Sequence, residues 1–216
     1  MYEQPKILIH LLHLCEFIAL VAGIIKFKSL KNSYWKWFVV YLAYIFVYEI
    51  ISFVAKAEFK SKIGVFQSYV HIPIEYLFLF WLFAVKSLKN KALFWWLSLL
   101  FLVSLVFDDY LKQKDYSFLS LNTTVGNLLL LVLVMSEFLK QIKSDAILNF
   151  KENKMFYINV GVTFFYIGNM PFFALYFDIL EIPKYWNSYY IYFMVSNCLM
   201  YLLFAASFIW GKVKSY

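Results

Sequence analysis

The sequence contains no arginine, and all 20 of its positively charged side chains are lysine. The planar guanidinium fork is the usual tool for gripping a phosphate or a carboxylate, and no side chain in this chain can supply it. The net charge of +7 is high enough to attract nucleic acid, but the lysines border long apolar runs, where they act as topology signals. We therefore expect no nucleic acid among the partners.

Charged residues are also scarce, at 15% of the 216 residues, whereas 63% are hydrophobic and 23% are aromatic. Globular domains are usually about 45–50% apolar, so this composition is that of a chain that water alone would not keep folded. The two cysteines, Cys15 and Cys198, lie inside apolar runs and support neither a disulfide framework nor a metal motif of known spacing. We predict an integral membrane protein with a single domain over 1–216.

Uncharged stretches long enough to cross a bilayer recur along the chain. About 20 helical residues span the ~30 Å hydrocarbon core. We predict seven transmembrane helices, at about 7–25, 35–55, 63–85, 92–111, 118–139, 155–177 and 188–210. The first is expected to be retained, because Met1–Lys6 lacks the features of a signal peptide. The predicted architecture is an all-α, polytopic bundle.

The lysines are shared unequally between the two sides of the predicted bundle. Thirteen fall on the side that holds the loops after the first, third and fifth helices and the C-terminus, against seven on the other side. The positive-inside rule then places the N-terminus outside and the C-terminus in the cytoplasm. Aromatic residues at the predicted helix ends, such as Trp35 and Trp37, indicate interfacial anchoring. We expect a multi-pass protein of a bacterial inner membrane.

Several predicted helices carry ionisable side chains within the hydrocarbon. Such groups cost roughly 2.5–3.5 kcal/mol each on insertion scales, so they usually face the bundle interior and find partners. The spacing of His10, His13 and Glu16 covers an arc of about 120°, which predicts one inward face for all three. His71 and Glu75 are one helical turn apart, and Pro73 between them is expected to loosen the backbone.

Counted at 1.5 Å per residue, the polar groups form one layer about 9–18 Å below the outer edge. This layer predicts a polar cavity that opens outward. The candidate ligand or proton site comprises His13, Glu16, Glu49, His71, Glu75, Asn127, Asn169 and Asn197. A helix break is expected at Gly168–Pro171, where freed backbone groups must face protein or a wet cavity.

Three interpretations of these residues stay open. Imidazole and carboxylate are common zinc ligands, so one interpretation is a divalent metal such as zinc. Its candidate ligands are His10, His13, His71 and Glu75. The second interpretation is mutual hydrogen bonding as packing, and the third is a proton-linked or ligand-sensing pocket. No metalloprotease motif, phosphate loop or nucleophile elbow is present, so no catalytic residue is predicted.

Three stretches resemble small, mostly uncharacterised seven-helix proteins of bacterial inner membranes. These stretches are His71-Ile-Pro-Ile-Glu75-Tyr-Leu, Phe164-Phe-Tyr-Ile-Gly168-Asn169, and Tyr185-Trp186 through to Asn197. The resemblance implies a role in sensing or signalling beside histidine kinases. A further resemblance, to accessory membrane proteins of antiviral systems such as CRISPR-Cas, has no motif behind it.

The leading hypothesis is a sensor or regulatory protein that acts through a protein partner at its lysine-rich cytoplasmic face. One alternative is a membrane-embedded, metal-dependent enzyme acting on a lipid-like substrate, in which a glutamate activates a metal-bound water. The other is an accessory protein or pore-forming effector of an antiviral, CRISPR-associated system, which would assemble as a homo-oligomer. All three place the chain in a lipid bilayer.

Overall fold

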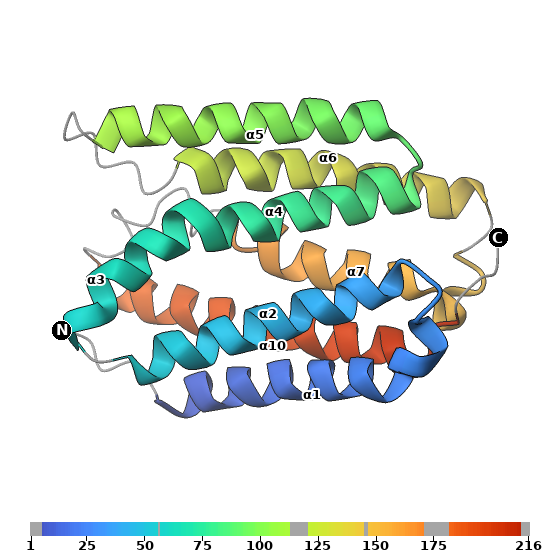
Figure 1. Ribbon diagram of the computed structural model, residues 1–216, viewed down its shortest axis with the longest axis horizontal. Helices are drawn as coiled ribbons and strands as arrows, with labels where there is room; N and C mark the ends of the chain where they lie inside the picture. Colours follow the sequence, from blue (N-terminus) through green and yellow to red (C-terminus); the bar gives the residue numbers. More distant parts are fainter. Residues whose placement is uncertain (1–5, 56, 113–120, 145–146, 171–181, 213–216) are drawn as a thin grey trace. The chain divides into compact units, whose positions relative to one another are not determined.

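The computed structural model of the chain describes residues 6–55, 57–112, 121–144, 147–170 and 182–212, most of which are helical (Figure 1). Within these ranges no β-strand forms, although an isolated bridge pairs Asn153 with Lys212. The predicted all-α fold class is therefore confirmed.

Several helices follow one another after only a few residues, as between Leu30 and Trp35 and between Ser87 and Lys91. In chain order they are α1 (Lys6–Leu30), α2 (Trp35–Val54), α3 (Ala57–Phe66), η1 (Gln67–His71), α4 (Ile72–Phe80), η2 (Trp81–Ser87), α5 (Lys91–Lys112), α6 (Leu121–Lys143), η3 (Phe150–Glu152), α7 (Lys154–Val162), η4 (Thr163–Ile167) and α10 (Pro183–Ile209). The segments η1, η2 and η4 are π-helical, and η3 is a 3₁₀ turn. From α3 to η2 the chain is helical without interruption.

Among the described residues, six helical stretches are long and apolar enough to cross a membrane. They are Ile7–Leu30, Trp35–Val54, Glu58–Ser87, Lys91–Asp108, Leu121–Lys143 and Tyr185–Ile209. The helix predicted at 155–177 begins in α7 and continues into η4, but residues 171–177 lie outside the described residues. The chain is thus a multi-pass, helical membrane protein, whereas the count of seven and the orientation stay predictions.

Two helices extend well beyond their predicted limits. The first runs to Leu30 instead of residue 25, and the third stretch begins at Ala57 instead of residue 63. Both extensions contain lysine, at Lys26 and Lys60 for example. Long lysine side chains can lay their aliphatic stems along the helix while the ammonium reaches water. Charge therefore marks the edge of the hydrocarbon and not the end of the helix.

The chain divides into two compact units that alternate along the sequence. Unit 1 comprises Met1–Lys56, Gln141–Phe165 and Ile191–Tyr216, and unit 2 comprises Ala57–Lys140 and Tyr166–Tyr190. The single domain over 1–216 stays a prediction.

Unit 1 packs α1, α2 and α10 around large aromatic rings. The fully buried ring of Phe38 meets Phe204 edge-on with centroids 5.1 Å apart and lies 5.6 Å from Phe208. Gly23 lets α1 approach α2 closely, because a Cβ at position 23 would lie only 3.1 Å from Val39 Cγ2. Within a bilayer such close packing, rather than removal of apolar surface from water, holds helices together.

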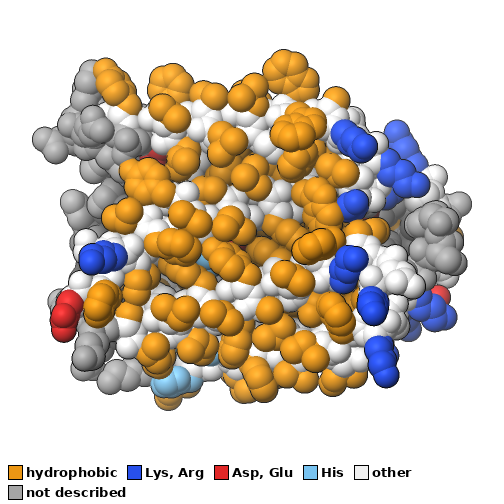
Figure 2. Space-filling model, viewed as in Figure 1, with side chains coloured by type: hydrophobic (Ala, Val, Ile, Leu, Met, Phe, Trp, Pro, Cys, Tyr) orange, Lys and Arg blue, Asp and Glu red, His pale blue; other side chains and the backbone are white. Residues whose placement is uncertain are grey.

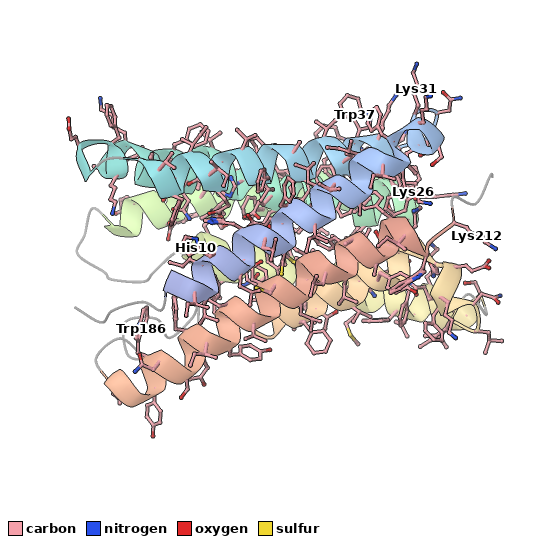
Figure 3. The ribbon with its side chains drawn as sticks, turned by 90° about the horizontal axis from the view of Figure 1, so that it is seen from below. His10, Lys26, Lys31, Trp37, Trp186 and Lys212 are labelled. Carbon is pink, nitrogen blue, oxygen red and sulfur yellow. The ribbon has the colours of Figure 1, made fainter. Side chains whose placement is uncertain are left out.

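The two ends of α1 differ in character, as Figure 3 shows. His10 lies near the first end, whereas Lys26 and Lys31 lie near the second, where the chain turns into α2. That second end of unit 1 also holds Lys212, whose backbone N–H donates to Glu152 O at 2.9 Å and whose ammonium pairs with the Glu152 carboxylate. Lys26, Lys31 and Lys212 therefore lie at one end of unit 1, as expected for lysines that border the apolar runs.

Lys154 is an exception among these lysines, because its side chain is only 4% exposed. Its Nζ donates to the carbonyl of Ser207 at 2.8 Å. The same Nζ lies 5.4 Å from the ring centroid of Phe208 and 5.9 Å from that of Trp35. Faces of aromatic rings attract cations at these distances. The ammonium is thus held inside unit 1, at the start of α7.

Unit 2 packs α4 against α5 and α6. Phe80 and Phe101 are fully buried and meet edge-on, with ring centroids 5.9 Å apart. The ring of Tyr76 lies 5.0 Å from Phe101 and crosses α6 at Gly126. A Cβ on Gly126 would lie 2.7 Å from Tyr76 Cε1, so only glycine fits under this ring.

Large hydrophobic side chains cover the outside of both units. Examples are Val47, Trp96 and Val195, each more than half exposed, and Figure 2 shows such side chains over most of the face in view. A water-soluble monomer rarely exposes apolar patches of this extent. This surface fits contact with lipid chains.

Candidate functional site: the Glu75 cluster

Pro73 shapes the backbone that carries the main polar cluster of unit 2. Proline has no N–H, and in a regular helix its ring would collide with the carbonyl of Tyr69, four residues earlier. The helix widens instead into η1, so that the N–H of Ile72 donates to the carbonyl of Gln67, five residues earlier. Single π-turns of this kind often occur at functional sites. His71 is the last residue of η1, and Glu75 follows in the first turn of α4.

Polar side chains from four elements meet near this turn. We call His71, Glu75, Tyr76, Asn127 and Tyr166 the Glu75 cluster. His71 Nε2 and Glu75 Oε2 are 3.9 Å apart, which is charge-pair distance but too long for a hydrogen bond. The hydroxyl of Tyr166, from η4, donates to Glu75 Oε1 at 3.2 Å. One carboxylate thus links η1, α4 and η4.

The second half of the cluster is built on α6. The Tyr76 hydroxyl donates to Asn127 Oδ1 at 2.7 Å and also lies 3.2 Å from the Thr123 carbonyl oxygen. The rings of Tyr76 and Tyr166 meet edge-on with centroids 5.6 Å apart. The two tyrosines therefore connect the carboxylate of Glu75 to the amide of Asn127.

The cluster is shielded from solvent, yet one of its donors is unused. His71 is 4% exposed, Asn127 is fully buried, and the Glu75 side chain is 18% exposed. Among the residues the structure describes, nothing accepts a hydrogen bond from Asn127 Nδ2. Leaving a buried donor unsatisfied costs about 1–3 kcal/mol, so such a group calls for a water or a ligand. The imidazole or the carboxylate of the cluster can accept a proton. Together with the amide donor, these groups can also bind a small polar molecule.

In unit 1 the predicted inward face of α1 is wrong for His10. Glu16 is buried, but His13 is only half-buried and His10 is exposed. The two imidazoles meet the ring of Phe53 edge-on, at centroid distances of 5.5 Å for His10 and 5.1 Å for His13. The arc of the three side chains is offset from the stripe that α1 buries, so Glu16 lies within the stripe and His13 at its edge. His10 therefore falls on the outer side of the helix.

The predicted site residues divide between the two units. Unit 1 contains His13, Glu16, Glu49 and Asn197, and unit 2 contains His71, Glu75, Asn127 and Asn169. Within unit 2 the structure brings His71 to Glu75 and reaches Asn127 through Tyr76. Glu49 and Asn197 are half-buried, and Asn169 is buried.

The helix break predicted at Gly168–Pro171 is present as far as it is described. The π-helix η4 ends at Ile167, and a turn follows at 168–169. Pro171 lies outside the described residues. The π-turn of η4 also carries Tyr166 to the Glu75 cluster.

Tyr76 and Tyr166 were missed as site residues. The chain has 18 tyrosines, and their concentration near helix ends favoured membrane anchoring as their general role. A buried tyrosine hydroxyl needs a partner within the protein, but burial is not visible in the sequence. The position of Tyr76 directly after Glu75 was the one available signal.

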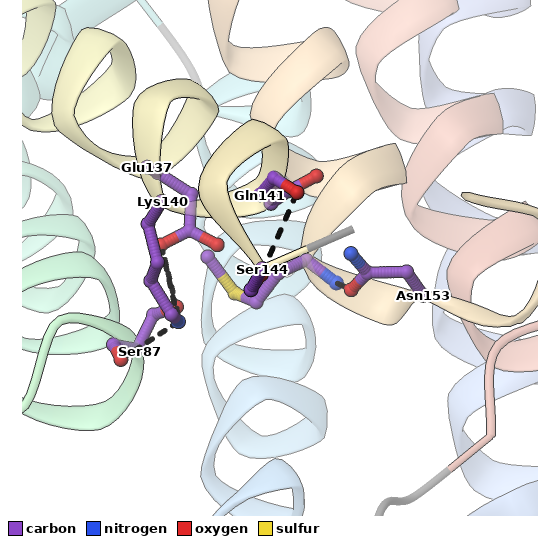
Figure 4. Close-up of polar contacts among 7 residues, drawn as sticks. Ser87, Glu137, Lys140, Gln141, Ser144 and Asn153 are labelled. Atoms are coloured by element: carbon purple, nitrogen blue, oxygen red, sulfur yellow. Dashed lines mark hydrogen bonds and ion pairs between the residues drawn. The ribbon is translucent and has the colours of Figure 1, made fainter. Parts of the chain in front are cut away.

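A second polar group that sequence reasoning missed joins η2 to α6 (Figure 4). Ser87 Oγ donates to Glu137 Oε2 at 2.6 Å. Lys140 Nζ donates to Ser87 Oγ at 2.7 Å and to the Ser87 carbonyl at 2.9 Å, and it lies 3.6 Å from Glu137 Oε2. Glu137 is only 1% exposed, so these partners satisfy a carboxyl group that water does not reach. The i, i+3 spacing of Glu137 and Lys140 was the sequence signal.

The described part of the chain does not support a metal site. No three His, Cys, Asp or Glu side chains among the described residues are placed to share a metal ion. Of the candidate ligands, His10 and His13 belong to unit 1, whereas His71 and Glu75 belong to unit 2. The zinc site stays a prediction.

Fold and site together define a multi-pass helical membrane protein with a buried polar cluster. No family model matches the chain, and no curated protein or solved structure is significantly similar to it. Its function is therefore argued from the Glu75 cluster.

Proposed function

We propose that this chain is a membrane sensor or regulatory protein in which the Glu75 cluster binds a proton or a small polar ligand. The observation that carries the proposal is the His71–Glu75 pair, with Nε2 and Oε2 3.9 Å apart within an apolar helical stretch. Ionisable groups are costly in hydrocarbon, and where they occur they commonly mark ion pathways or proton relays.

Protonation gives the cluster two hydrogen-bonding states. The carboxylate form of Glu75 accepts from the Tyr166 hydroxyl, as observed. The protonated form has its own O–H to donate, so the Tyr166 contact weakens or reverses. Tyr166 lies on a π-helical segment, where widened turns leave the backbone room to shift. A proton at Glu75 would thereby alter the packing of η4 against α4.

The signal would leave the membrane through the loops that connect the helices. We place the lysine-rich side in the cytoplasm of a bacterium and the N-terminus outside, following the distribution of 13 lysines against seven. On that side a protein partner would read the change in helix packing.

Infrared difference spectroscopy of the reconstituted protein, between acidic and alkaline pH, tests whether Glu75 titrates. We expect the band of a protonated carboxyl group in the wild type and its loss in Glu75→Gln. Glu58→Gln, which alters an exposed glutamate of α3, is the matched control and should keep the band. An unchanged band in Glu75→Gln would exclude Glu75 as the titrating group.

Hydrogen exchange separates sensing from simple packing. In the wild type, amide exchange across η4 should change between the same two pH values, and in Glu75→Gln it should be independent of pH. If Glu75 titrates but amide exchange across η4 does not change, the cluster contributes only to packing and the proposal is overturned.

A further inference from the structure

A groove with a volume of about 520 Å³ opens on the outer surface of unit 1, between α1 and α2. This volume lies within the ~300–1,000 Å³ typical of small-molecule sites. Apart from one lysine, its lining is apolar. The lining residues are Leu20, Ile24, Ile25, Phe27, Lys28, Val39, Val40 and Ala43.

The groove has the length and direction of one lipid leaflet. From Leu20 to Lys28 the helix rises about 12 Å, which is close to half of the ~30 Å hydrocarbon core. Its inner end is entirely apolar, whereas Lys28 stands at the end where α1 leaves the membrane. On α2 the groove is lined by Val39, Val40 and the small side chain of Ala43. An acyl chain fits the apolar part.

Positive charge gathers at the end of α1 that holds Lys28 of the groove. Between Glu16 and Glu49 the sequence contains four lysines and no acidic residue. Of these lysines, Lys26, Lys28 and Lys31 are exposed at the end of α1, and Figure 3 shows Lys26 and Lys31 near the turn into α2. A headgroup at this level of the membrane would meet these cations.

We propose that the α1–α2 groove binds an anionic glycerophospholipid, with one acyl chain between Leu20 and Ala43 and the phosphate-bearing headgroup against Lys28 and Lys31. Charge complementarity selects the headgroup, and the apolar walls hold the chain. The site belongs to unit 1 and is independent of the Glu75 cluster.

Native mass spectrometry of the detergent-purified, delipidated protein tests this site with two probes. These are dioleoylphosphatidylglycerol and dioleoylphosphatidylcholine, which carry the same chains and differ in headgroup charge. The wild type should retain phosphatidylglycerol more strongly. Lys28→Gln with Lys31→Gln should weaken its binding roughly fivefold for each lysine removed and leave phosphatidylcholine unchanged.

A matched pair of variants tests the chain-binding half. Ala43→Phe should fill the groove and reduce binding of both lipids, whereas Val47→Phe, one turn further along α2 on the exposed surface, should not. Ala43→Leu replaces Ala43→Phe if the larger ring prevents folding. Lys60→Gln with Lys62→Gln, on α3, controls for total charge.

Three results would overturn the proposal. Equal retention of the two lipids by the wild type would remove the headgroup selectivity. If the α3 lysine control weakens phosphatidylglycerol binding as much as Lys28→Gln with Lys31→Gln does, overall charge and not this site attracts the lipid. Unchanged binding in both Ala43 variants would place the acyl chain outside the groove.

Discussion

Lys154 keeps an ammonium group inside unit 1, against two aromatic rings and a carbonyl. It precedes the span predicted at 155–177. Burial, together with the nearby charge of Lys26, lowers the pKa of Lys154 from its usual 10.5 to about 8. The carbonyl of Ser207 and the ring of Phe208 favour the cation and so oppose this shift. The side chain therefore links the stability of unit 1 to pH.

The sign of this link follows from the two pKa values. Between about pH 8 and 10.5, the unfolded chain still binds the proton that the folded chain has released, so the free energy of unfolding rises with pH. Over the whole interval of 2.5 units the gain is about 3 kcal/mol at most. Below pH 8 this gain is absent.

We predict that thermal melts in detergent will show this rise in the wild type and not in Lys154→Met. The comparison is the change in melting temperature between pH 7.5 and 10. Lys151→Met, which alters an exposed neighbour, should respond to pH as the wild type does. If the melting temperature of Lys154→Met rises between pH 7.5 and 10 as much as that of the wild type, Lys154 keeps its proton over this range. The aromatic rings would then stabilise the cation by more than burial destabilises it.

At the level of elements, α4 and α6 are in contact where a glycine lies under a tyrosine ring. The ring of Tyr76 rests on Gly126, and its hydroxyl bonds to Asn127 one residue further on. An added methyl group at Gly126 would push the ring away and break that bond. Overpacking of this kind typically costs about 1–3 kcal/mol.

We predict that Gly126→Ala destabilises the protein by about 1–3 kcal/mol. Tyr76→Phe, which removes only the hydroxyl, should cost about 1 kcal/mol. Gly64→Ala is the matched control, because a Cβ at Gly64 meets nothing within 4 Å; it should be neutral or slightly stabilising. Unfolding in mixed detergent measures all three. A Gly126→Ala protein as stable as Gly64→Ala would mean that the ring moves aside freely.

Three π-helical segments occur in the helices that the structure describes, and the cause is clearest for η1. Pro73 cannot donate a backbone hydrogen bond, and the widened turn before it accommodates the ring. Two of these segments, η1 and η4, each deliver one residue to the Glu75 cluster, namely His71 and Tyr166. The irregular backbone and the polar side chains therefore coincide, as expected for a site within an apolar helix.

At the scale of the whole molecule, periodicity and composition predicted where the helices lie in the sequence but not which face of each helix is buried. Apolar runs located six membrane-crossing stretches within a few residues, because bilayer thickness constrains length strongly. The neighbours of each helix decide which side is buried, and no local pattern encodes them. This is why His10 was expected inside and lies outside, and why Tyr76 and Lys154 were not recognised as buried polar residues.

The orientation of the chain decides which side of the membrane the lysine-rich loops face, and it can be tested with single cysteines. Both native cysteines are buried and are replaced by serine in the background protein. Lys31→Cys then reports on the turn between α1 and α2, and Lys60→Cys reports on α3; both native side chains are exposed. In intact spheroplasts a membrane-impermeant maleimide should label Lys60→Cys and should label Lys31→Cys only after permeabilisation. The reverse pattern would place the lysine-rich side outside the cell and would remove a cytoplasmic partner from the proposed mechanism.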